Sequence, residues 1–159
     1  MIELKKITKV FNQGAPNEYT GIRDVSLTID TGRINCFQGP SGSGKTTLLS
    51  MIGCLSKPTQ GRITINGEIL SGLPERFLAG VRQRRFGFVF QSANLIRGIS
   101  LLENVMLPSY PLGTPYRNLR SRSLDLLERF ELLSKKNMSP ETLSGGEARR
   151  AAICRALVN

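Results

Sequence analysis

Alternating apolar and polar residues mark three short segments in the first half of the chain. The apolar positions are Ile2 and Leu4 in the first segment, Val25, Leu27 and Ile29 in the second, and Ile63 and Ile65 in the third. A period of two places these side chains on one face of a strand, so each segment predicts a half-buried β-strand. The third segment runs into Asn66-Gly67, a dipeptide typical of tight hairpin turns. The three segments therefore predict antiparallel β-structure.

Other segments predict two further strands and a set of helices. Ile34–Gln38 predicts a short strand, Phe86–Phe90 predicts a buried strand, and Thr46–Ile52 predicts a helix. Residues 100–137 show helical spacing, interrupted by prolines. The apolar positions include Leu124, Leu127 and Leu132, and the prolines are Pro108, Pro111 and Pro115. Because proline interrupts helices, this region predicts a helical subdomain entered through a kinked loop.

A glycine-rich loop follows the Ile34–Gln38 strand and precedes the Thr46–Ile52 helix. It fits G-x-x-x-x-G-K-[ST], in which backbone N–H groups surround a polyphosphate. Lys45 is the predicted cation that reaches the phosphates, and Thr46 is the predicted Mg²⁺ ligand. The predicted nucleotide contacts in this segment are Gly39, Pro40, Ser41, Gly42, Ser43, Gly44, Lys45, Thr46 and Thr47. The alternative, a glycine-rich turn without a ligand, would leave a lysine against the positive end of a helix dipole.

A second motif, Leu143-Ser144-Gly145-Gly146-Glu147, distinguishes one class of phosphate-loop proteins from the rest. Ser144 and Glu147 fit a capping box that opens a helix over Ala148–Leu157. A cap alone does not require two glycines, each of which costs a helix about 1 kcal/mol relative to alanine. Close approach of a phosphate to bare N–H groups does require them.

Together the two motifs resemble the nucleotide-binding subunit of an ATP-binding cassette (ABC) transporter. The resemblance implies an α/β fold of the phosphate-loop NTPase type, with a parallel core sheet, an antiparallel β subdomain and a helical signature subdomain. It implies that ATP lies between the phosphate loop of one subunit and Ser144, Gly145, Gly146 and Glu147 of its partner in a homodimer.

Two more residues match the family pattern. Phe11 stands where the family stacks an aromatic ring on adenine; alternatively, it is a core aromatic that ends the first strand. Gln91 stands where a glutamine touches Mg²⁺ and the attacking water; alternatively, it is a surface amide. Thr46 and Gln91 are thus the implied metal ligands. Arg85–Gln91 and Leu102–Pro108 most resemble the branch that serves lipoprotein release and the export of macrolides or peptides.

The resemblance spans the whole chain and implies one domain. Its expected parts are residues 1–70 (antiparallel β-structure and phosphate loop), 71–92 (a helix and the strand before Gln91) and 93–159 (the helical subdomain). In the family, a strand ending in Asp-Glu and a histidine that contacts the γ-phosphate follow the signature helix. Residues 1–159 include no such strand and no histidine. We therefore expect a truncated, incomplete domain, without catalytic residues, that binds nucleotide far better than it hydrolyses it.

Composition adds limits on compartment and partners. The chain has 22 Lys and Arg against 12 Asp and Glu, a formal net charge of +10. The arginines cluster without interleaved aromatic residues, so no specific nucleic-acid partner is expected. Cys36, Cys54 and Cys154 are expected to be small buried hydrophobic residues in a reducing compartment. No apolar run is long enough to span a bilayer, which predicts a cytoplasmic protein.

The expected function is that of an ATP-binding subunit that drives a transmembrane permease from the inner face of the membrane. Its cofactors would be ATP and Mg²⁺. Two alternatives remain open. One is a non-hydrolysing regulatory remnant, and the other is a soluble ABC ATPase that acts on nucleic acid.

Overall fold

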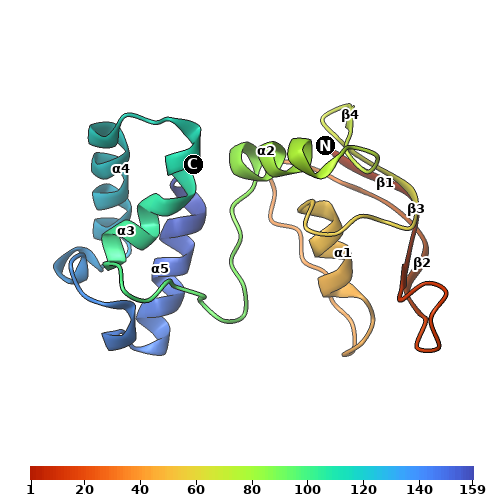
Figure 1. The fold of residues 1–159 in the computed structure, drawn as a ribbon, viewed down its shortest axis with the longest axis horizontal. Coiled ribbons are helices and arrows are strands. Elements are labelled where there is room, and N and C mark those ends of the chain that lie inside the picture. Colours follow the sequence, from red (N-terminus) through yellow and green to blue (C-terminus); the bar gives the residue numbers. More distant parts are fainter. The chain divides into compact units, whose positions relative to one another are not determined.

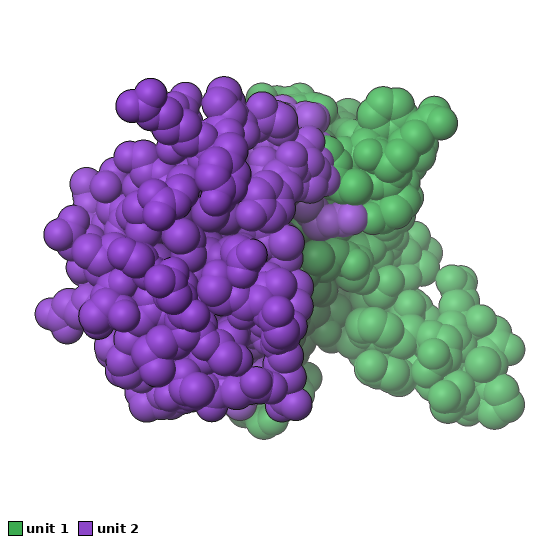
Figure 2. Space-filling model, turned by 60° about the vertical axis from the view of Figure 1, so that its left-hand side comes forward, with its two compact units in different colours: residues 1–80 green, residues 81–159 purple.

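The computed structural model describes all residues from 1 to 159, and they form two compact units. Unit 1 comprises residues 1–80 and unit 2 comprises residues 81–159 (Figure 2). The division falls within one helix, α2 (Glu75–Arg85).

Unit 1 is built on a four-stranded antiparallel sheet with the strand order β2-β1-β3-β4 (Figure 1). The strands are β1 (Ile2–Phe11), β2 (Tyr19–Ile29), β3 (Gln60–Ile65) and β4 (Glu68–Ile69). In the register, Ile2 lies opposite Ile29 on one side and opposite Ile65 on the other. Asn66 and Gly67 form the turn between β3 and β4, with φ angles of 50° and 84°. The three alternating segments and the hairpin are therefore confirmed.

The core of unit 1 lies between the sheet and the helix that follows the phosphate loop. The sheet contributes Leu4, Ile7 and Ile63, and α1 (Lys45–Ile52) contributes Leu48, Met51 and Ile52. The helix predicted over Thr46–Ile52 is confirmed and begins one residue earlier. Its position brings the loop at its N-terminus up against β2.

The predictions of two further strands are wrong. Neither Ile34–Gln38 nor Phe86–Phe90 belongs to a sheet. Ile34 is fully exposed, and Val89 and Phe90 are 52% and 48% exposed, so the second segment is not buried either. A strand requires a hydrogen-bonded neighbour, and no strand within residues 1–159 pairs with these segments. The expected parallel sheet is accordingly not formed in this part of the fold.

The prediction that all three cysteines are buried is confirmed for two of them and wrong for the third. Cys54 and Cys154 are buried, as predicted, and burial raises the pKa of the Cys154 thiol to about 11. Cys36 is exposed because it lies in the unpaired Ile34–Gln38 segment. The prediction that it is buried was wrong.

Unit 2 is helical. Its α-helices are α3 (Leu101–Met106), α4 (Tyr116–Arg129) and α5 (Gly145–Leu157), with short 3₁₀ turns η1 (Leu107–Leu112), η2 (Leu133–Lys135) and η3 (Pro140–Thr142). The three α-helices pack around a core that includes Leu101, Val105, Leu119, Leu127, Ala151 and Cys154. The predicted proline breaks are confirmed, because Pro108 and Pro111 lie in η1 and Pro115 precedes α4. None of the helices is both long and apolar enough to cross a bilayer.

Candidate functional site

The phosphate loop, residues 39–46, turns tightly into α1. Gly39, Gly42 and Gly44 have φ angles of 154°, 81° and 87°. Gly44 caps α1 in the left-handed region, and a Cβ atom there would lie 2.9 Å from the Gly21 carbonyl oxygen and 3.0 Å from Ile22 Cγ1. Both the conformation and the close approach to β2 therefore require glycine at position 44.

Lys45 reaches back across this loop. Its Nζ donates hydrogen bonds to the carbonyl oxygens of Gly39 (2.9 Å) and Pro40 (2.7 Å), and to Ser43 Oγ (3.2 Å). These three bonds hold the positive charge directly above the turn. The cation that the motif predicts is thus placed at the loop by the loop's own backbone.

The backbone N–H groups at the start of α1 have no hydrogen-bond acceptors within the helix. The first i to i−4 bond of the helix runs from the Leu48 N–H to the Gly44 carbonyl, so the N–H groups of Lys45, Thr46 and Thr47 precede it. No side chain caps this end, and the first turn carries no acidic residue. The positive helix dipole and the Lys45 ammonium therefore combine with no anion from the chain, an arrangement that favours a bound phosphate.

A pocket of about 420 Å³ lies at this end of α1. Its walls come from the loop and from β2, and its lining includes Gly21, Ile22, Arg23, Gly39, Ser43, Gly44 and Lys45. This is a reasonable size for part of a small ligand. Arg23 is a second cation in the pocket that the sequence motif did not single out.

An aromatic pair lies close to the same pocket. Phe11, the last residue of β1, stacks on Tyr19 with ring centroids 4.9 Å apart and an interplanar angle of 15°. A Cβ atom at Gly21 would lie 2.7 Å from the Phe11 ring, and the Gly21 carbonyl oxygen would lie 2.9 Å from a Cβ atom at Gly44. Through Gly21, the predicted adenine-stacking residue and the phosphate loop are near neighbours. Tyr19 was missed, because only the β1–β2 register places it opposite Phe11.

The signature motif opens α5 with the predicted capping box. Ser144 Oγ accepts a hydrogen bond from the Glu147 N–H, and Glu147 Oε2 accepts one from the Ser144 N–H. Glu147 Oε1 also accepts a hydrogen bond from Lys135 Nζ at 2.6 Å. Lys135, followed by the Ser144 N–H, lowers the pKa of the Glu147 carboxyl to about 2. This carboxylate is thus engaged within its own chain.

The two signature glycines have no steric role inside the chain. A Cβ atom at Gly145 would meet nothing within 4 Å, and one at Gly146 would meet only Arg150 Nη1 at 3.9 Å. Neither residue has a positive φ angle. The packing and backbone conformation of the chain therefore do not explain glycine at these positions. Close approach of a group from outside the chain would explain it.

The backbone around Gln91 is anchored on both sides. A Cβ atom at Gly87 would lie 2.0 Å from the carbonyl oxygen of Ala156 in α5, so this segment contacts the helix backbone. Arg155 donates hydrogen bonds to the carbonyl oxygens of Ala93 (2.7 Å) and Asn94 (2.6 Å). Gln91 itself is exposed. Sequence reasoning gave Arg155 no role, since its partners are backbone atoms far away along the chain.

Asn104, which is fully buried in α3, completes this anchorage. It accepts a hydrogen bond from the Ile96 N–H (2.7 Å) and donates to the carbonyl oxygens of Ile96 (3.0 Å) and Ser100 (3.1 Å). A buried amide with all these bonds fixes the loop before α3.

A comparison with protein-family models matches residues 22–159 to the family described as ABC transporter. The chain belongs to this family. The match covers both the phosphate loop and the signature motif, and it confirms the ABC cassette fold class that the two motifs predicted.

Known relatives match the chain over its full length. The lipoprotein-releasing system ATP-binding protein LolD of Cereibacter sphaeroides is 40% identical, and the chain spans 71% of its length. The macrolide export ATP-binding/permease protein MacB of Hyphomonas neptunium is 41% identical, and the chain spans 24% of it. Two solved structures of the dimeric cassette MJ0796, one of them bound to ADP and Pi, are 40% identical with a TM-score of 0.90 over 100% of this chain and 70% of theirs.

The predicted site residues divide between the units. The phosphate loop and Phe11 belong to unit 1, where the structure brings them together. Gln91 and the signature residues belong to unit 2.

Proposed function

We propose that this chain is the ATP-binding part of an ABC exporter and couples ATP binding to substrate movement by a separate transmembrane permease. The observation that carries the proposal is the phosphate loop, where the Lys45 ammonium and the uncapped α1 N-terminus meet at a pocket lined by β2. The relatives, named as lipoprotein-releasing and macrolide-exporting proteins, support the transport role.

The proposed nucleotide contacts divide by chemistry. The backbone N–H groups of residue 39 and of residues 41–47, together with the Lys45 ammonium, bind the phosphates, while Phe11 and Tyr19 provide a stacking surface for adenine. Thr46 and Gln91 are the proposed Mg²⁺ ligands. Hydroxyl and amide oxygens are hard donors suited to this ion, and both side chains are exposed.

The proposed partners are a permease and a second copy of the ATP-binding domain. The solved MJ0796 cassette is a dimer, and we propose that Ser144, Gly145 and Gly146 contact the nucleotide of the partner copy. Glu147 contributes through its helix cap. Binding to the permease would hold the protein at the cytoplasmic face of the membrane.

The direct test of this proposal is Lys45→Ala. Loss of a charge-assisted hydrogen bond worth about 1.5–3 kcal/mol weakens ATP binding by about tenfold or more. Lys57→Ala, which removes an exposed cation from unit 1 outside the pocket, is the charge-matched control. Titration of a fluorescent ATP analogue measures both variants, and equal affinities for wild type and Lys45→Ala would exclude the phosphate-loop assignment.

A further inference from the structure

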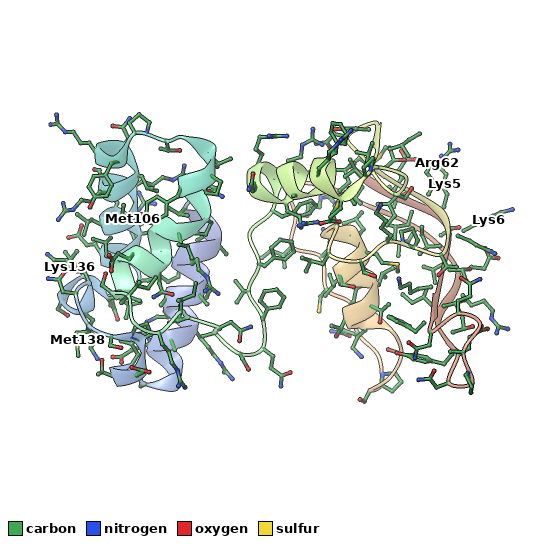
Figure 3. All side chains as sticks on the ribbon, viewed as in Figure 1. Lys5, Lys6, Arg62, Met106, Lys136 and Met138 are labelled. Atoms are coloured by element: carbon green, nitrogen blue, oxygen red, sulfur yellow. The ribbon has the colours of Figure 1, made fainter.

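A second pocket lies in unit 1, on the sheet face that points away from α1. It has a volume of about 670 Å³ and is lined by Lys5, Lys6, Ser26, Gln60, Gly61 and Arg62. Three of these six residues are cations and none is an acid. Figure 3 shows the side chains of Lys5, Lys6 and Arg62 together on the side of β1 and β3 opposite α1. This surface is separate from the residues that form the phosphate-loop pocket.

A β-bulge in β1 brings both lysines to this face. Leu4 and Ile7 are both buried, while Lys5 and Lys6 between them are both exposed. Leu4 and Ile7 pair with Leu27 and Val25, so three steps along β1 match two steps along β2. Regular alternation would send one lysine into the core, whereas the extra residue lets both reach solvent.

The same bulge is visible from the other neighbouring strand. Lys5 lies opposite Arg62 and Thr8 lies opposite Gln60, which again gives three steps on β1 for two on β3. The bulge therefore places the Lys6 position beside the cross-strand pair of Lys5 and Arg62. Two neighbouring strands thus supply the three cations.

The bulge carries a backbone conformation that is unusual for lysine. Lys6 has a φ angle of 51°, in the left-handed region where bulges commonly use glycine. Its N–H donates to Ser26 Oγ at 2.9 Å. On the other side, a Cβ atom at Gly61 would lie 2.3 Å from the Lys6 carbonyl oxygen. The Lys6 backbone is thus fixed in a strained conformation between β2 and β3, and this conformation directs its side chain to the exposed face.

The charges in the pocket are only partly neutralised. Lys5 Nζ lies 3.2 Å from Glu3 Oε2, whereas Lys6 and Arg62 form no ion pair. A guanidinium and an ammonium on adjacent strands suit phosphate oxygens, the first as a two-pronged donor and the second as a point charge. The hydroxyl of Ser26 and the amide of Gln60 add uncharged donors.

We propose that this pocket binds a phosphate-bearing anion, independently of the nucleotide at the phosphate loop. A free phosphorylated compound and the headgroup of an anionic lipid share this chemistry. Lys6 and Arg62 are the principal ligands, and the β1 bulge positions Lys6 for the purpose.

The test removes the two principal cations in a Lys45→Ala background, where anion binding at the phosphate loop is weakened. Lys6→Asn removes the charge with a residue that tolerates left-handed φ angles, and Arg62→Gln removes the other charge. The matched control, Arg117→Gln with Arg120→Gln on α4, lowers the net charge by the same amount at exposed positions. Calorimetric titration with pyrophosphate is expected to show a loss of about tenfold or more for the first pair and little change for the control pair.

A second arm identifies the source of the anion. Co-sedimentation with phosphatidylglycerol-containing vesicles, against vesicles of phosphatidylcholine alone, tests a lipid headgroup. A loss confined to pyrophosphate supports a free compound, a loss confined to vesicles supports a lipid, and a loss in both supports the shared phosphate chemistry. Lys6→Arg, which keeps the charge, should retain binding in whichever arm responds.

Two results would overturn the proposal. One is equal weakening by the pocket pair and the α4 pair, which would show that only overall charge matters. The other is the absence of any effect in both arms while circular dichroism shows folded protein. Because these measurements use the Lys45→Ala background, they can fail while the ATP-binding test succeeds, and the reverse also holds.

Discussion

At the first turn of α5, the side chains of Ser144 and Glu147 differ in how many hydrogen-bonding groups they have free for a ligand. The Glu147 carboxylate already accepts hydrogen bonds from Lys135 and from the Ser144 N–H. The Ser144 hydroxyl accepts one bond from the Glu147 N–H, which leaves its own hydrogen available to donate. A phosphate that approaches this helix end would therefore meet the hydroxyl and the bare N–H groups of Gly145 and Gly146, while Glu147 holds the turn in place.

The lowered pKa of Glu147 predicts a pH-dependent contribution to stability. Its folded-state pKa of about 2 lies below the ordinary 4.5, so its contribution is fully present above about pH 4.5 and is lost as the pH falls toward 2. Urea unfolding from pH 7 to pH 2 should show wild type more stable than Glu147→Gln at pH 7, with the difference closing below pH 4.5. Glu128→Gln, at an exposed position on α4, is the control. A difference that stays constant down to pH 2 would contradict the role of the Lys135 ion pair.

The aromatic pair gives a second prediction at this scale. Phe11→Tyr should leave ATP affinity nearly unchanged, while Phe11→Ala should cost about 1–3 kcal/mol of stacking. Tyr19→Ala should also weaken binding, because Tyr19 stacks on Phe11 and is itself 56% exposed. Titration of ATP measures these variants, with Tyr116→Ala in α4 as a control. A loss of thermal stability without any loss of affinity would show that Phe11 serves only the core of unit 1.

The positions of some of these residues could be predicted from the sequence, and those of others could not. The difference depends on whether a residue's partners are close to it along the chain. The position of Lys45 at the loop could be predicted from spacing alone, since the loop and the helix that follows it are contiguous in the chain. The roles of Tyr19, Asn104 and Arg155 depend on atoms that only the strand register or the packing of unit 2 brings near them. The exposure of both Lys5 and Lys6 could not be predicted either, because the bulge in β1 is apparent only from its pairing with β2 and β3.

Helices could be predicted from the sequence better than strands, again because their interactions are more local. The start of α5 could be predicted from Ser144 and Glu147, because a capping box is complete within four residues. Ile34–Gln38 and Phe86–Phe90 have suitable composition for strands but lack a partner within residues 1–159. Strand formation depends on backbone groups elsewhere in the chain, so apolar composition alone did not decide it.

The close contact between residues 86–90 and α5 predicts a strict requirement for glycine. Gly87→Ala would place a methyl group 2.0 Å from the Ala156 carbonyl oxygen, and one of the two segments must move. We expect a loss of about 1–3 kcal/mol in the free energy of unfolding, typical of overpacked sites. Gly72→Ala, where the new methyl group meets nothing within 4 Å, is the control. Thermal unfolding measures both, and equal melting temperatures would show that α5 does not hold this segment.

On the scale of the whole molecule, the two nucleotide motifs belong to different compact units. The phosphate loop is complete in unit 1, with its cation, its helix end and its pocket. The signature is complete in unit 2, with glycines that the chain's own packing does not require. Each motif is thus formed within its own unit, which is compatible with the proposal that a nucleotide is shared between two copies of the chain.

The last prediction tests this sharing. Ser144→Arg should leave ATP binding by a single copy intact, because the phosphate loop is untouched, but it should block nucleotide-driven dimerisation by placing a bulky cation where the partner's phosphate would approach. The matched control is Ser100→Arg, because Ser100 and Glu103 form the same capping box on α3. Each substitution removes a helix cap worth about 1 kcal/mol, so the two variants share that loss of stability and differ only at the signature. Size-exclusion chromatography with a non-hydrolysable ATP analogue should show dimers for wild type and Ser100→Arg and monomers for Ser144→Arg. Undiminished dimers with Ser144→Arg would mean that the signature does not act on the partner's nucleotide, and the unexplained glycines would then require another ligand.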